Sequence, residues 1–587
     1  MSRLRAPAVV ALALPLAAPA LPGEAAAQQP PAAASELRDT VERYAADRAA
    51  LQRRYGVPFA PARRERLRAF ADGWRERLAR MDFERLGGEG RVDYVLLDHE
   101  LRYQLALLER EDRLYAQTAP WLPFAGAIMD LEAARRSMEP VDPAAVARTL
   151  AALARRVDST RLATADRWDA RDAAAGDGIT RVTARRAGNV LEELGETFEE
   201  WHEFYAGYDP SFTWWTAEPY RKAAAALESY LEFLRETVAG IREGEPEPII
   251  GDPIGADGLR ADLEHEMIAY GVRDLLAIAE REYAWCDAEL RKASREMGFG
   301  DNWKAALERV KQSYVPPGEQ PRVVRDLALE AIAFVEDRGL VTVPPLAKEI
   351  WRMEMLSPER QLVSPFFLGG EVIRVSYPTD AMAHDDKLMS MRGNNPHFSR
   401  ATVHHELIPG HHLQGFMTSR YNTHRRVFST PFWGEGWALY WEMLLWDLGF
   451  PQTPEDRMGM LFWRTHRAAR IIFSLRFHLG EMSPAEAVDF LVDRVGHERA
   501  NAEGEVRRSF AGDYDPLYQA AYMLGGLQFR ALYEELVGSG RMTDRAFHDA
   551  ILEGGRMPVE MVRARLTGES LTRDYRARWR FAEPRGR

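Results

Sequence analysis

Residues 36–54 read ELRDTVERYAADRAALQRR, and this stretch shows the pattern that recurs over most of the 587-residue chain. Apolar side chains return at spacings of three and four residues with charged side chains between them, which is typical of an amphipathic helix. The same spacing occurs in 90–115, 143–160 and 180–205, where runs of β-branched residues are scarce. The sequence therefore predicts a mainly α-helical protein.

A stretch rich in glycine, proline and acid, EGEPEPIIGDPIGADG at 243–258, interrupts the helical pattern. Such composition is typical of a linker, and a chain of this length is expected to form more than one lobe. We therefore expect an N-terminal helical lobe over 36–242, a linker over 243–258 and a second lobe over 259–587. Within the second lobe, helical patterns cover 259–298 and 301–338.

Three short runs enriched in β-formers follow these helices, at 340–345, 350–355 and 371–377. Turn residues separate the runs, which indicates short strands rather than helices. They predict a small β-sheet just before a histidine-rich segment at 403–415. Helical patterns resume near residue 399 and continue to the end.

The N-terminal region has the layout of a secretory signal peptide. Two arginines precede the short apolar run 6–20, and small residues at 25–27 offer a cleavage site. We predict a signal peptide over 1–27, a flexible leader over 28–35 and an exported, periplasmic or secreted protein. An uncleaved N-terminal anchor is the alternative, although the run is shorter than a membrane-spanning helix requires. No second apolar run of that length occurs, so we expect no membrane span in the mature chain.

Charge and cysteine content narrow the functional classes further. The formal charge is −12, which argues against nucleic acid as a partner because nucleic acid binding requires a basic surface. Cys286 is the only cysteine, so no internal disulfide is possible. No cysteine lies near the predicted cleavage site, which argues against a lipid-modified N-terminus.

Residues 403–415 read Val-His-His-Glu-Leu-Ile-Pro-Gly-His-His-Leu-Gln-Gly and hold four of the fourteen histidines. Neutral imidazole is a good zinc ligand, and a glutamate beside the first ligand can accept a proton from a water molecule on the metal. In the familiar His-Glu-x-x-His arrangement, both histidines lie on one face of a helix. The segment therefore predicts a zinc site that includes His405, with Glu406 as a general base. Another divalent metal is an alternative, since affinity alone does not select zinc.

The second histidine is not fixed by spacing, because Pro409 stands where the familiar arrangement has histidine. On a regular helix His411 would point about 120° away from His405, whereas His412 would share its face about 10.5 Å along the axis. Proline and glycine both disturb a helix, so a local break at Pro409-Gly410 is expected to bring His411 into the ligand position. His411 and His412 both remain candidates on this reasoning.

A third ligand is expected further along the chain, and Glu435 stands thirty residues after His405 in Pro-Phe-Trp-Gly-Glu-Gly-Trp. A helix that begins here would present Glu435 in its first turn. A buried structural acid is the competing interpretation. Glu442, seven residues later, shares that helix face and is either a partner of a metal ligand or a surface acid.

These residues resemble the bacterial family called domain of unknown function 885. The resemblance rests on His405-Glu406-x-x-Pro-Gly-His-His-Leu-Gln and on Glu435-Gly-Trp-Ala-Leu-Tyr, and extends over about residues 40–580. The family looks like a distant relative of helical zinc peptidases such as thimet oligopeptidase and Taq-type carboxypeptidase. The resemblance implies a large, two-lobed helical shell, with His405, His411 and Glu435 as zinc ligands. The Pro-Gly insertion departs from the strict peptidase motif.

A tyrosine is expected to stabilise the developing oxyanion, as in the peptidases that the chain resembles. Tyr518 and Tyr522 lie four residues apart on one helix face, and the resemblance favours Tyr522. Simple packing of both rings is the alternative. Arg507 and Arg508 are candidates to bind a substrate carboxylate, although a surface charge run is the simpler interpretation.

We therefore expect an exported zinc metallohydrolase, with a peptide or small amide as substrate and Glu406 and Tyr522 as catalytic residues. The small sheet at 340–377 would offer an edge for an extended peptide. One alternative is hydrolysis of a non-peptide amide or ester at the same site. Another is an inactive exported binding protein, although such a protein has no need of a base at Glu406.

Overall fold

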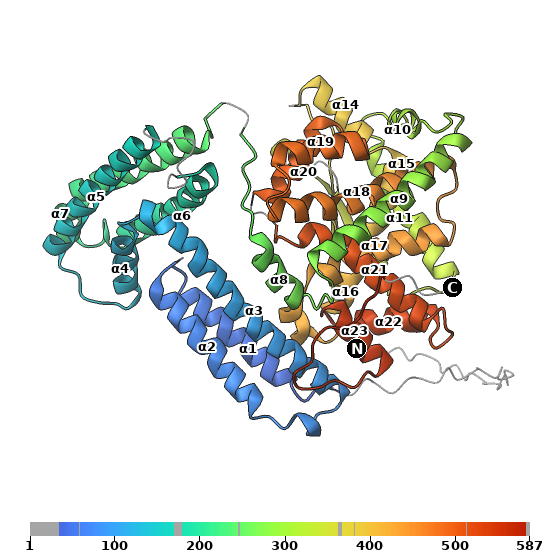
Figure 1. The fold of residues 1–587 in the computed structure, drawn as a ribbon, viewed down its shortest axis with the longest axis horizontal. Helices are drawn as coiled ribbons and strands as arrows, with labels where there is room; N and C mark the ends of the chain where they lie inside the picture. Colours follow the sequence, from blue (N-terminus) through green and yellow to red (C-terminus); the bar gives the residue numbers. More distant parts are fainter. Residues whose placement is uncertain are drawn as a thin grey trace, which may run out of the picture. The chain divides into compact units, whose positions relative to one another are not determined.

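Helices make up almost all of the regular structure (Figure 1), which confirms the predicted mainly α-helical fold. The structure is a computed structural model and describes residues 34–57, 59–169, 179–244, 247–361, 367–380, 382–511 and 514–582. The predicted signal peptide and all but the last two residues of the predicted leader lie outside the described residues. None of the helices in the described ranges is long and apolar enough to cross a lipid bilayer.

The N-terminal helices follow the predicted amphipathic segments closely. A three-residue 3-10 turn, η1 (Phe83–Arg85), precedes α3, another, η2 (Ala119–Trp121), follows it, and the π-helical turn η3 (Phe233–Ala239) extends α7. The helices are α1 (Arg38–Arg54), α2 (Pro61–Ala79), α3 (Gly88–Thr118), α4 (Ala125–Arg136), α5 (Pro143–Asp169), α6 (Arg181–Tyr205) and α7 (Pro210–Glu232).

A break interrupts each of the two long helical patterns predicted at 259–298 and 301–338. Each pattern holds two helices, and Pro316-Pro317-Gly318 lies in the second break, where proline removes backbone donors. The elements before the histidine-rich segment are α8 (Gly255–His265), α9 (Val272–Glu296), α10 (Trp303–Lys311), α11 (Gln320–Asp337), α12 (Pro345–Ile350), β1 (Arg352–Met355), α13 (Pro358–Gln361), β2 (Val372–Val375) and α14 (His384–Gly393).

The remaining helices carry or surround the histidine-rich segment. Several begin with a polar capping residue followed by proline, which favours the first position of a helix; Thr430-Pro431 and Thr453-Pro454 are examples. These elements are α15 (Pro396–Glu406), α16 (His411–Thr418), the 3-10 turn η4 (Thr423–Phe428), α17 (Pro431–Asp447), α18 (Pro454–His478), α19 (Pro484–Val495), α20 (Arg499–Phe510), α21 (Tyr518–Leu536), α22 (Asp544–Gly554) and α23 (Val559–Thr567).

The small sheet has two parallel strands, with Arg352 opposite Val372 and Met355 opposite Val375. This confirms a small sheet before the histidine-rich segment, but the strand predicted at 340–345 is wrong. Thr342 in that run is bonded to a side chain instead of a neighbouring strand. Its backbone N–H and its hydroxyl donate to the Asp549 carboxylate, at 2.9 and 2.6 Å.

The largest apolar core combines helices from both ends of the chain. Val41 of α1, Leu97 of α3, Trp437 of α17, Phe529 of α21 and Met561 of α23 all belong to it. A separate core lies among α4, α5, α6 and α7. The predicted division into lobes at 243–258 stays a prediction.

A buried charge cluster joins α3 to η4, the turn between α16 and α17. Arg425 is fully buried, and its guanidinium donates to Asp93 at 2.6 Å and to Glu89 at 2.7 Å. His424 lies 2.7 Å from the other oxygen of Asp93. The N-terminal helix α3 therefore fixes the turn that connects two helices of the histidine-rich region.

Candidate metal centre

The helix that carries His405 ends at Glu406, and a new helix begins at His411. The link between them contains a cis peptide bond between Ile408 and Pro409. Only glycine fits at position 410, because a Cβ atom there would overlap the carbonyl oxygen of His405. The Pro-Gly pair therefore breaks the helix, as its sequence predicts.

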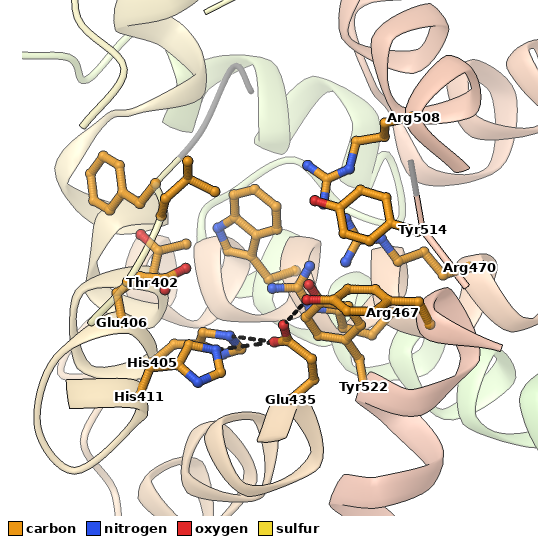
Figure 2. Close-up of a pocket in the computed structure, with 15 residues that line it drawn as sticks. Thr402, His405, Glu406, His411, Glu435, Arg467, Arg470, Arg508, Tyr514 and Tyr522 are labelled. Carbon is orange, nitrogen blue, oxygen red and sulfur yellow. Dashed lines mark hydrogen bonds and ion pairs between the residues drawn. The ribbon is translucent and has the colours of Figure 1, made fainter. Parts of the chain in front are cut away.

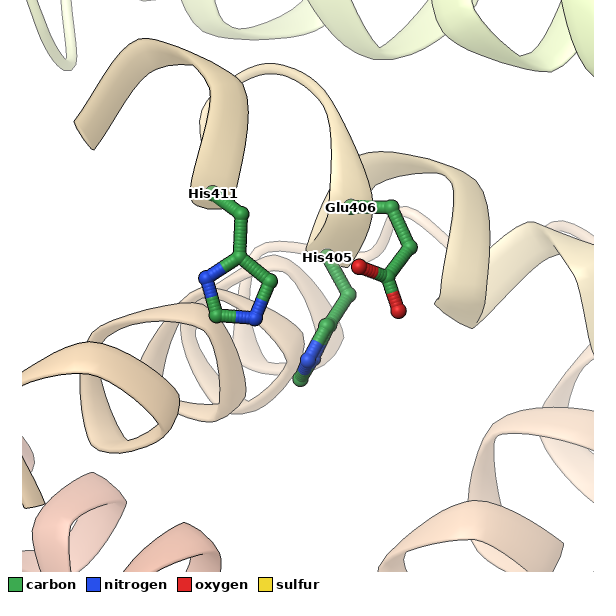
Figure 3. Close-up of side chains that lie close together, drawn as sticks. All are labelled: His405, Glu406 and His411. Atoms are coloured by element: carbon green, nitrogen blue, oxygen red, sulfur yellow. The ribbon is translucent and has the colours of Figure 1, made fainter. Parts of the chain in front are cut away.

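This break brings His405 and His411 together around one carboxylate oxygen (Figure 2). Oε2 of Glu435 lies 3.5 Å from Nε2 of His405 and 3.1 Å from Nε2 of His411. Glu406 completes the group, and its ligand atom lies within 4.8 Å of those of the two histidines (Figure 3). The imidazole nitrogens of His405 and His411 and the carboxylate of Glu435 form a donor set that suits a catalytic zinc ion.

Glu442 fixes the orientation of His405 from the opposite side of the ring. The Nδ1 atom of His405 donates to Oε1 of Glu442 at 2.6 Å, which directs Nε2 towards Glu435, where a bound metal ion would replace the Nε2 proton. Burial opposes charge on His405, but Glu435 and Glu442 overcome it and raise its pKa to about 9. Burial alone would raise the pKa of Glu435, but the two histidines hold this pKa well below its usual value.

The other two histidines of the segment face different partners. His412 points to the backbone of α12, with Nε2 2.7 Å from the carbonyl oxygen of Ala347. His404 donates from Nδ1 to the carbonyl oxygen of Arg400 at 2.7 Å. Of the two candidates left open by spacing, His411 is therefore the one that reaches Glu435.

Glu406 lies against Gly369 and Gly370, just before β2. A Cβ atom at Gly369 would overlap the Glu406 carboxylate, and the backbone N–H of Gly370 donates to the Glu406 carbonyl oxygen at 3.2 Å. Burial raises the pKa of Glu406. Gly369 and Glu406 both line a cavity of about 320 Å³ that also contains His405, His411 and Glu435.

Both candidate tyrosines line the same cavity, from one face of α21. The Tyr518 hydroxyl donates to Oε1 of Glu435, while the Tyr522 ring stacks on His405 at a centroid distance of 6.2 Å. Glycines allow α21 to approach α17 closely, because a Cβ atom at Gly436 would lie 2.5 Å from the Cα of Gly525. The sequence singled out Tyr522, but Tyr518 is the tyrosine that forms a hydrogen bond with a candidate ligand.

The profile of one bacterial family matches residues 31–566, which is most of the chain. The chain belongs to this family, "Bacterial protein of unknown function (DUF885)". The family predicted from the histidine and glutamate motifs is thereby confirmed. No curated protein matches the chain.

Two solved structures share the fold of this DUF885 protein. One is a "putative lipoprotein of unknown function" from Shewanella oneidensis, 17% identical, with a TM-score of 0.66; the match covers 91% of this chain and 100% of that one. The other is a "putative lipoprotein" from Colwellia psychrerythraea, 15% identical, with a TM-score of 0.58; it covers 91% of this chain and 97% of that one. At these identities the likeness shows the fold alone.

Three arginines of the DUF885 protein also line the cavity, opposite Glu406 in Figure 2. Arg467 and Arg470 lie on α18, and Arg508 lies on α20. Sequence reasoning missed the first two and favoured a surface position for Arg508, whose side chain is only 11% exposed. The available signal was the sequence of α18, where Arg467 and Arg470 share one face of a helix that is otherwise rich in apolar residues.

Proposed function

We propose that this DUF885 protein is a zinc-dependent hydrolase that cleaves peptide or amide bonds. The observation that carries the proposal is the convergence of two imidazole Nε2 atoms and the Glu435 carboxylate beside a second carboxylate, Glu406. The donor set fits zinc, since the hydrogen bond from His405 to Glu442 leaves Nε2 available for a metal. His405, His411 and Glu435 would hold the ion.

The remaining groups of the cavity suit the hydrolysis of an amide. A bound zinc ion would supply a Lewis acid that polarises a carbonyl group and acidifies water. Glu406 accepts the proton of the attacking water and passes it to the leaving amine. Burial raises the pKa of Glu406, which brings it closer to the range in which a general base works well near neutral pH. Tyr522 lines the cavity and is the candidate donor to the developing oxyanion, since the Tyr518 hydroxyl donates to Glu435.

The cellular location of the protein and its relationship to known peptidases also belong to this proposal. We infer that the protein is exported, from the signal layout of residues 1–27. The names of the two structural neighbours, which call them lipoproteins, support export. Lipid attachment to this chain is not part of the proposal, because Cys286 is buried within α9. A distant relationship to the helical zinc peptidases is proposed from the motif alone.

Metal analysis and a peptide digest test the activity directly. We expect about one zinc ion per chain, and cleavage of a peptide and amide library that stops with a chelator and returns with added zinc. Zinc-loaded protein that cleaves nothing in such a library would contradict the proposal. That result would favour the inactive binding protein.

The role of Glu406 is tested by Glu406→Gln, which keeps the size of the side chain and one hydrogen-bonding oxygen. We expect this variant to fold and retain zinc, while peptide hydrolysis falls by at least ~100-fold, within the usual range for a general base. Glu435→Gln is the matched control and should lose zinc as well as rate. An active, zinc-bound Glu406→Gln enzyme would show that another group accepts the proton.

A further inference from the structure

The wall of the cavity opposite Glu406 is strongly cationic for a buried surface. Arg467 and Arg470 are only 6% and 2% exposed, and Arg508 lies beside them (Figure 2). Charged side chains are almost never buried unless they are paired. Three guanidinium groups at one end of a small cavity therefore call for negative partners.

Glu505 of α20 neutralises only part of this charge. Arg470 donates to both of its oxygens, at 2.6 and 3.0 Å, in a bidentate pair. Arg508 lies 3.6 Å from the same carboxylate without forming a hydrogen bond. Glu505 thus supplies one negative charge to both Arg470 and Arg508, and it forms no ion pair with Arg467.

Arg467 has no carboxylate within ion-pair distance among the described residues, and its Nε atom is buried without a hydrogen bond. Its guanidinium packs over the rings of Trp463 and Tyr522, with centroids at 5.3 and 4.5 Å. Ring contacts offset only part of the cost of burying a charge. Burial and the neighbouring Arg470 lower the pKa of Arg467, and the more distant carboxylates of Glu442 and Glu435 offset only part of this effect.

The size and layout of the cavity restrict the ligand. Its volume of about 320 Å³ is at the lower end of the range for small-molecule sites. His405, His411 and Glu406 lie on one side of the view, and Arg470 and Arg508 lie on the other (Figure 2). A ligand that fills the cavity would place a reacting carbonyl at the first side and a negative group at the second.

We propose that Arg467, with Arg470 and Arg508, binds the free carboxylate of the substrate's C-terminal residue. The enzyme is then an exo-acting hydrolase that releases one C-terminal amino acid, and this inference rests on the proposed hydrolase function. Water adds its oxygen to the carbonyl carbon of the last amide bond, the C–N bond breaks, and the amine leaves with a proton from Glu406. A carboxylate suits the site because a single unpaired guanidinium calls for a single negative charge, which a planar guanidinium binds through two parallel hydrogen bonds.

A pair of substrates that differ in one group tests the inference. We would compare N-benzoyl-Gly-Phe with its C-terminal amide at equal concentration and full zinc loading. The free acid should be cleaved at least about tenfold faster, because hydrogen bonds to charged groups are the stronger ones. Equal cleavage of both substrates would overturn the carboxylate subsite and leave the hydrolase function standing.

A binding measurement decides the inference even if the protein hydrolyses nothing. In zinc-loaded Glu406→Gln protein, calorimetry should find the dipeptide Gly-Phe bound at least about tenfold more tightly than Gly-Phe amide. Preferential binding by this variant, together with no hydrolysis by the zinc-loaded wild type, would keep the subsite and refute the hydrolase. Equal binding would overturn the subsite, and so would competition by inorganic phosphate that is stronger than competition by acetate.

Substitution of Arg467 assigns the preference to a residue. Arg467→Met, made in the Glu406→Gln protein, should abolish the preference for the free acid without lowering the melting temperature, since no carboxylate loses its partner. Arg476→Met on the same helix is the control and should keep the preference, because Arg476 is 39% exposed. Arg470→Met should lower the melting temperature, as the buried Glu505 carboxylate loses its bidentate partner. A preference that survives Arg467→Met would overturn the assignment.

Discussion

His411 and His412 are adjacent in sequence, but we expect only His411 to bind the metal. His411 faces Glu435, whereas His412 is bonded to the backbone of α12. We expect His411→Ala to lose most of its zinc during gel filtration, while His412→Ala retains it. Metal analysis of the two purified variants checks this. Zinc retained by His411→Ala and lost by His412→Ala would place the metal on the other face of α16.

The residues brought together in the site were predictable where they share a local motif. His405, Glu406 and His411 lie within seven residues, so their chemistry is visible in the sequence. Glu435 was accessible through its spacing and the family resemblance. Arg467 was not, because its position in the cavity depends on how α18 packs against α15 and α21, and that packing is a tertiary property.

Among the elements, the turn at Gly369 and Gly370 before β2 determines where the Glu406 carboxylate can lie. Because a Cβ atom at Gly369 would overlap that carboxylate, Gly369→Ala should displace it and reduce hydrolysis by at least ~10-fold while zinc is retained. Gly415→Ala in α16 is the control, since nothing lies within 4 Å of its added Cβ atom. Activity and zinc content of both variants provide the measurement. Full activity in Gly369→Ala would show that the carboxylate does not depend on this contact.

Sequence periodicity predicted the type of element correctly for long segments, and the prediction failed for a short one. The amphipathic segments at 36–54 and 180–205 correspond to α1 and α6 almost to the residue. The run at 340–345 has the composition of a strand, but it ends in two prolines and lies beside Asp549 rather than another strand. A short apolar run does not reveal its partner, and the partner determines whether a strand forms.

For the whole molecule, buried neutral histidines predict sensitivity to acid. Burial lowers the pKa to about 3 or 4 for five of them, which are His265, His404, His478, His497 and His548. It also holds the pKa of His466 well below its usual value. Their ordinary pKa is about 6.5, so below that pH the unfolded chain binds protons that the folded chain does not. Stability is therefore fully present above pH 6.5 and decreases as the pH falls towards 4.

Two groups with large shifts act in the opposite direction: burial raises the pKa of Glu266 to about 8, and the pKa of His405 is raised to about 9 by its carboxylate partners despite burial, but the six lowered histidines outnumber them. We expect the free energy of unfolding to be lower at pH 5 than at pH 7 by at least about 2 kcal/mol, because each such histidine contributes up to about 1.4 kcal/mol per pH unit. Urea unfolding with a chelator present, so that metal release does not contribute, provides the measurement. An unfolding free energy that is the same at both pH values would contradict this expectation.

The shared core of the first and last helices has a consequence for the order in which the chain can fold as it is synthesised. Glu89 of α3 pairs with Arg425 and with Arg565, the latter 476 residues further along the chain. The ribosome releases α1, α2 and α3 long before α23 exists, so their apolar faces have no permanent cover during most of translation. Contacts this distant in sequence form late and slowly. The growing chain is therefore a natural client for chaperones that hold unfolded segments, and truncation near its C-terminus should leave its N-terminal helices prone to aggregation.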